Sequence, residues 1–105
     1  MNIPENTTMP HNEAATPEQQ EMALYEQAVA LFGKEHQILI AIEEMSELTK
    51  ALVKYLRYGG NPDVLASIQE ERADVEIMLN QLHVIFGDCS KQECEKLDHL
   101  RELLG

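Results

Sequence analysis

Glycine divides this sequence into segments whose apolar residues recur every three or four positions. Gly33, the pair Gly59-Gly60 and Gly87 each follow such a segment. Glycine commonly ends helices, and a spacing of three or four places side chains on one helical face, so the pattern predicts helices joined by short turns. The segments are rich in Ala, Leu, Ile, Glu, Gln and Lys, and aromatic residues make up only 5% of the chain. This composition favours an all-α fold without strands.

Capping signals indicate where each helix begins. Thr16-Pro17-Glu18-Gln19 combines an N-cap residue, a proline in the first turn and a capping-box glutamine. Asn61-Pro62 gives a similar start, and Ser90 with Glu93 forms a second capping-box pattern. The expected helices run from the first cap to Phe32, from about Lys34 to Tyr58, from Pro62 to Phe86 and from Ser90 through the last leucines. Because short connections make neighbouring helices antiparallel, we expect a four-helix antiparallel bundle.

Each expected helix has an apolar face that can line a core. In chain order the faces are Met22, Tyr25, Ala28, Val29 and Phe32; Ile38, Ile42, Met45, Thr49, Leu52 and Leu56; Ile68, Val75, Met78, Leu79, Leu82 and Phe86; and Cys94, Leu97, Leu100, Leu103 and Leu104. The third helix also carries a second stripe, Ala73, Ile77 and Val84, roughly opposite the first. A free-standing surface helix seldom shows two apolar stripes, so we expect a homodimer or homotetramer that forms through these faces.

The length of 105 residues, with 44% of them hydrophobic, allows one modest core. Residues 16–105 are therefore expected to form a single domain. Residues 1–15 are polar, contain Pro4 and Pro10 and show no apolar period. We expect this segment to be a disordered tail, because it has too little apolar surface to offset the entropy cost of ordering.

The net charge of −11 argues against binding to a nucleic-acid polymer, which normally requires an exposed basic patch. An anionic substrate would need metal cations. No stretch reaches the roughly 18 to 20 apolar residues of a membrane span, and the N-terminus lacks a signal-peptide pattern. Cys89 and Cys94 lack the paired spacing of a zinc site, and we expect both to be reduced thiols. These features predict a cytoplasmic protein without a membrane partner.

Two pairs of acids are the candidate functional residues. Glu44 and Glu47 lie three apart on the second expected helix, as do Glu71 and Asp74 on the third, so each pair shares a helical face. In a hairpin closed at Gly59-Gly60, a rise of ~1.5 Å per residue brings the two pairs within about 3 Å of the same level. The sequence therefore predicts that four carboxylates meet between these helices.

Glu71 lies within the apolar stripe of the third helix, where an ionised carboxylate without a partner is costly. Several such acids together require a cation. Oxygen ligands without Cys or His suit Mg²⁺, or Mn²⁺, better than zinc. Two structural alternatives stay open: Glu43 and Glu47 form a solvated face with nearby lysines, or Arg72 neutralises one of the acids.

The segments EEMSE at residues 43–47 and ERAD at residues 71–74, separated by 23 residues, resemble a known signature. It is the EExxE…ExxD motif of the MazG-like nucleotide pyrophosphohydrolases, which are all-alpha NTP pyrophosphatases. The resemblance covers residues from about 34 to 86, half of the chain. It implies hydrolysis of a nucleoside triphosphate to the monophosphate and pyrophosphate, through attack of a metal-activated water on the α-phosphorus.

The same resemblance assigns roles to individual residues. It implies that Glu44, Glu47, Glu71 and Asp74 hold the magnesium ions and that Glu43 supports the site or positions the water. Three cations farther along the second helix are candidates for binding the outer phosphates of the substrate: Lys50, Lys54 and Arg57. The alternative is that these cations only offset the charge of an acidic helix.

Other functional classes were compared with the sequence. Diiron carboxylate bundles need Glu-x-x-His, and no Glu stands three residues before a His. A P-loop needs a second glycine and a hydroxyl residue around Gly33-Lys34, and both are missing. The non-enzymatic alternative is an acidic helical interaction module that retains the family frame and binds a partner protein through the second apolar stripe.

Overall fold

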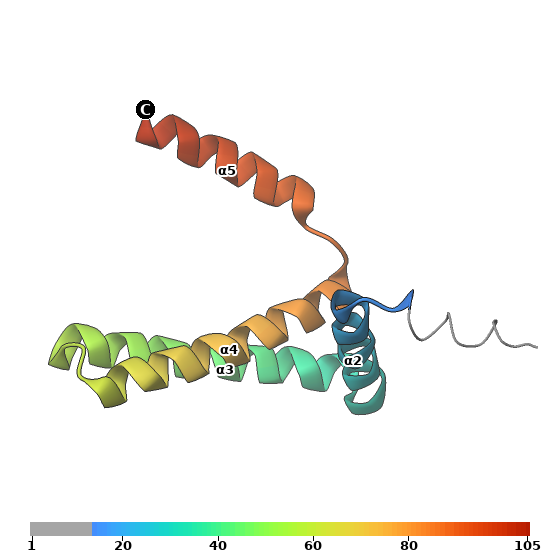
Figure 1. The fold of residues 1–105 in the computed structure, drawn as a ribbon, viewed down its shortest axis with the longest axis horizontal. Helices are drawn as coiled ribbons and strands as arrows, with labels where there is room; N and C mark the ends of the chain where they lie inside the picture. Colours follow the sequence, from blue (N-terminus) through green and yellow to red (C-terminus); the bar gives the residue numbers. More distant parts are fainter. Residues whose placement is uncertain (1–13) are drawn as a thin grey trace, which may run out of the picture.

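A computed structural model of the chain describes residues 14–105. These residues form four helices and no strand: α2 (Pro17–Phe32), α3 (Lys34–Tyr58), α4 (Pro62–Phe86) and α5 (Ser90–Leu104) (Figure 1). The prediction of an all-helical chain is confirmed. The tail predicted for residues 1–15 lies outside the described residues, except for its last two positions. None of the described helices is both long enough and apolar enough to span a membrane.

The capping signals explain where α2 and α4 begin. The Thr16 hydroxyl accepts a hydrogen bond from Gln19 N at 3.1 Å, and the Gln19 side chain accepts one from Thr16 N at 2.9 Å. Asn61 Oδ1 accepts a hydrogen bond from Val64 N at 3.0 Å. Gly33 and Gly59, which follow α2 and α3, have φ angles of 94° and 86°, a region that strongly favours glycine. The predicted limits of these helices are confirmed.

The start of α5 differs from the prediction. Ser90 is the first residue of the helix, and its hydroxyl donates to Asp88 Oδ1 at 2.6 Å instead of accepting from Glu93 N. Ser90 N donates to the same oxygen at 3.2 Å. The capping box predicted for Ser90 and Glu93 is therefore wrong, because Cys89 is the N-cap residue and its carbonyl oxygen accepts from Glu93 N at 2.9 Å.

α3 and α4 form an antiparallel hairpin, and α2 crosses it at the end remote from the turn (Figure 1). α2 packs on both of the other helices. The buried apolar residues are few: Ala41 and Ala51 on α3, and Val75 and Met78 on α4. The core of the described chain is therefore a narrow seam between α3 and α4.

The apolar face predicted for the second helix is not the one that packs in a single chain. Ile42 and Leu52 are 52% and 44% exposed, whereas Ala41 and Ala51, each one residue earlier, are buried. Packing along small alanine side chains lets two helices approach closely, and it rotates the larger side chains outward. The prediction of this core face is wrong by about one residue, and the displaced side chains form an apolar surface.

α5 packs on none of the other helices in the described part of the chain and points away from them (Figure 1). Leu97, Leu100, Leu103 and Leu104 on this helix are all exposed. Three of the four helices thus pack together within one chain, while the apolar face of the fourth has no partner there.

Candidate metal site

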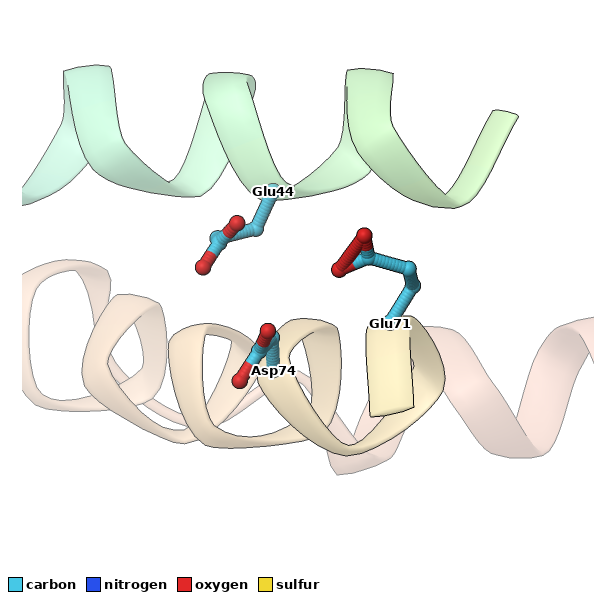
Figure 2. A group of neighbouring side chains, drawn as sticks. All are labelled: Glu44, Glu71 and Asp74. Atoms are coloured by element: carbon cyan, nitrogen blue, oxygen red, sulfur yellow. The ribbon is translucent and has the colours of Figure 1, made fainter. Parts of the chain in front are cut away.

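The hairpin of α3 and α4 brings three carboxylates together. Glu44 projects from α3, and Glu71 and Asp74 project from α4 into the same space (Figure 2). One carboxylate oxygen of each lies within 4.8 Å of the corresponding oxygens of the other two, and all three residues are half-buried. Three of the four residues expected to hold a metal ion are therefore brought together.

The electrostatics of this acid group favour a bound cation. Partial burial and the neighbouring charges of Asp74 and Glu71 raise the pKa of Glu44 above its ordinary value of 4.5. Partial burial and the neighbouring charges of Asp74 and Glu47 raise the pKa of Glu71. The carboxylates of Glu44 and Glu71 are thus harder to ionise than they would be in water, because they are partly buried among other acids.

Glu47, the fourth expected ligand, lies next to the acid group without belonging to it. It is half-buried one turn beyond Glu44, and its charge contributes to the raised pKa of both Glu44 and Glu71. Its Oε2 lies 3.4 Å from Lys50 Nζ, an exposed ion pair. Glu43 is exposed, and its charge also contributes to the raised pKa of Glu44. Both residues border the acid group on α3.

The cation expected to compete for these acids lies elsewhere. Arg72 is exposed, and its Nη1 donates to Gln69 Oε1 at 3.1 Å. Among residues 14–105, no ion pair joins Arg72 or any other basic side chain to Glu44, Glu71 or Asp74. The alternative in which Arg72 neutralises the acid group finds no support in this arrangement.

The acid group fits a small, hard divalent cation. Its ligand atoms are all carboxylate oxygens, which Mg²⁺ and Mn²⁺ prefer. Mg²⁺ usually retains several waters and binds few protein carboxylates, so three acids leave room for water and for phosphate oxygens. α3 and α4 are both continuous helices through the site, so the helical backbone determines where these acids lie.

The chain was compared with models of protein families, with curated proteins and with solved structures. No match was found in any of them. Function must therefore be inferred from the residues of the site and their geometry.

The expected phosphate-binding cations lie on the exposed side of α3 toward the hairpin turn. Lys50, Lys54 and Arg57 are all exposed. Lys50 contacts Glu47, and the guanidinium carbon of Arg57 lies 5.9 Å from the centre of the Tyr58 ring. These three basic residues thus lie farther along α3 than the acid group. The ion pair of Glu47 and Lys50 lies where the acidic and basic side chains meet.

A buried polar pair on the same helices was not predicted from the sequence. Gln37 on α3 and Gln81 on α4 are 5% and 6% exposed, and Gln37 Nε2 donates to Gln81 Oε1 at 2.7 Å. The sequence contains one feature that could have predicted this buried pair. Gln37 precedes Glu44 by seven residues and Gln81 follows Asp74 by seven, so each glutamine lies two turns from an acid on the same helical face.

Proposed function

We propose that this chain is a Mg²⁺-dependent nucleoside triphosphate pyrophosphohydrolase of the MazG-like type. One observation carries the proposal: the carboxylates of Glu44, Glu71 and Asp74 gather within 4.8 Å across the hairpin, with no ion pair to a basic side chain in the described residues. Such a group is costly as bare acids and favourable as a metal site. The EExxE…ExxD spacing supports the same function.

The proposed reaction is a hydrolysis at the α-phosphorus. Bound Mg²⁺ supplies an acidified water and neutralises charge on the triphosphate. Glu44, Glu71 and Asp74 would hold the cation, Glu47 would complete its ligands or bind a second ion, and Glu43 would orient the water. Oxygen from water bonds to the α-phosphorus, the bond to the bridging oxygen of the β-phosphate breaks, and pyrophosphate leaves.

The basic residues of α3 have a separate role in the proposal. Lys50, Lys54 and Arg57 bind the outer phosphates, which depart as pyrophosphate. Their position beyond Glu47 would let a triphosphate extend along α3 from the acid group toward the hairpin turn. The substrate is a nucleoside or deoxynucleoside triphosphate.

Self-association belongs to the same proposal. Two grooves of the described residues lie away from the acids, one along α5 and the other at the connection between α4 and α5. The acids are only half-buried in a single chain, and a neighbouring subunit would close the site. We propose that a cytoplasmic homodimer or homotetramer is the active form.

The decisive experiment incubates the purified protein with canonical and modified nucleoside and deoxynucleoside triphosphates plus Mg²⁺, and assays pyrophosphate. Glu71→Gln and Glu47→Gln are expected to abolish turnover while helical content stays the same, because each removes a repelling acid. Glu76→Gln is the matched control, since Glu76 is an exposed acid on α4 outside the group.

Each outcome of this assay has a clear meaning. Loss of activity in Glu71→Gln with full activity in Glu76→Gln supports the proposed site. Full activity in Glu71→Gln rules out the site assignment. Absence of turnover with every triphosphate favours the alternative of a non-catalytic interaction module.

A further inference from the structure

The hydrogen bond between Gln37 and Gln81 is a buried polar link in the seam between α3 and α4. Both side chains are more than nine-tenths buried, and the two residues come from opposite arms of the hairpin. A second hydrogen bond joins Gln37 Oε1 to Nδ1 of His36 at 2.8 Å. The amide of Gln37 is therefore held from both ends, and its orientation is fixed.

The glutamine pair and the acid group lie on one seam at two levels. Seven residues separate Gln37 from Glu44 on α3, and seven separate Asp74 from Gln81 on α4. At ~1.5 Å per residue this places the two levels about 10 Å apart, and seven residues return to nearly the same helical face. Ala41 and Met78, both buried, lie between the levels. A hairpin in which Gln37 meets Gln81 therefore also brings Glu44 to Asp74.

The short connection between α3 and α4 sets their register approximately, and the apolar residues buried in the seam do not fix it further. The buried apolar residues are Ala41, Ala51, Val75 and Met78. Small or flexible side chains of this kind accommodate a shift between helices, since their contacts are not directional. A shift would separate the two amides and leave buried donors and acceptors unpaired, which is strongly unfavourable. Buried polar pairs of this type are best known for specifying register.

We propose that Gln37 and Gln81 are positioning residues that set the register of α3 against α4 and so align Glu44 with Glu71 and Asp74 for metal binding. The inference rests on the proposed metal site for its functional consequence. The pair acts through helix register and makes no contact with the metal or the substrate.

The test separates register from stability. Gln37→Met and Gln81→Met each leave one buried amide unpaired, so each single variant is expected to melt at a lower temperature than the wild type. The double variant replaces both amides by apolar groups of similar shape, and its melting temperature is expected to return to the wild-type value. Its affinity for Mn²⁺, measured by calorimetry and by electron paramagnetic resonance, is expected to fall on the order of tenfold.

Met78→Leu is the control for a change in the same seam. It conserves volume between the two levels, and its Mn²⁺ affinity is expected to equal that of the wild type. A purely structural role for the glutamines predicts that Mn²⁺ affinity recovers together with the melting temperature in the double variant. That result would overturn the inference.

A measurement without metal tests the register of α3 against α4 separately from the proposed metal site. Nuclear Overhauser contacts between the methyl groups of Ala41 and Met78 report the register directly, and they are expected to shift or multiply in the double variant. An unchanged set of contacts in that variant overturns the positioning role, whether or not metal binds. A wild-type protein that binds no Mn²⁺ overturns the proposed metal site, and the methyl contacts then still decide the register.

Discussion

Partial burial and repulsion from neighbouring acids at Glu44 and Glu71 determine how the metal-free protein should respond to pH. Partial burial and neighbouring acids raise the pKa of Glu44 and Glu71 above 4.5 in the folded chain. The folded state therefore holds these protons more tightly than the unfolded state does. Their contribution to stability is present at low pH and is lost as the pH rises through the raised pKa values.

Glu71→Gln should remove part of this pH dependence. In EDTA, we expect the wild type to lose more stability between pH 5 and pH 7 than Glu71→Gln does, because the glutamine cannot ionise. Millimolar Mg²⁺ should raise the melting temperature of the wild type at pH 7 and not that of the variant, since ligand binding to the folded state stabilises it. Thermal melts followed by circular dichroism measure both effects.

The control for this titration is Glu76→Gln, which should follow the wild type at both pH values and respond to Mg²⁺ in the same way. Equal pH slopes for Glu71→Gln and the wild type would contradict the electrostatic account of the site.

Individual acids were predictable from the sequence, whereas the buried amides were not. Glu44, Glu71 and Asp74 follow from spacing, since depth along a hairpin can be counted from its glycine turn. Gln37 and Gln81 are polar and resemble surface residues. Their burial depends on which face of α3 meets α4, and this face is rotated by about one residue from the line of large apolar side chains.

At the level of helices, capping residues in the sequence predicted where a helix begins wherever the whole cap lies within one turn. The caps at Thr16 and Asn61 form as expected, because each cap bonds to an amide three residues away. The cap at Ser90 does not form because Cys89 is the N-cap residue, which places Ser90 in the first turn of the helix. The residue at which this helix starts depends on the path of the connecting loop, which a sequence pattern does not contain.

Asn61→Ala tests the contribution of one such cap to the hairpin. Loss of the Asn61 side chain leaves Val64 N without its acceptor, and the free energy of unfolding should fall by about 1 kcal/mol. Asn61→Asp keeps an acceptor at the N-terminus of α4 and should stay near the wild-type stability. Urea denaturation gives both values. Equal stability of Asn61→Ala and Asn61→Asp would show that the side-chain cap is dispensable.

For the whole molecule, the sequence indicated that α5 has an apolar face but not what this face contacts. In the described chain the helix packs on no other element, and an isolated helix of 15 residues is only marginally stable in water. Exposed ion pairs such as Asp98 with Arg101 add little to its stability. Its leucines match the exposed apolar surface of α3 in character, as expected if these faces meet between copies of the chain.

Leu100→Glu tests this assembly. Leu100 is 47% exposed in the single chain and would be buried between copies, where an unpaired carboxylate is costly. The wild type should elute with the mass of a dimer or tetramer of the 11.9 kDa chain, and Leu100→Glu should shift toward the monomer in light scattering. Lys91→Gln changes the net charge by the same amount at an exposed position and should keep the wild-type mass. A wild type that is monomeric at all concentrations would contradict self-association, and α5 would then need a partner of another kind to cover its leucines.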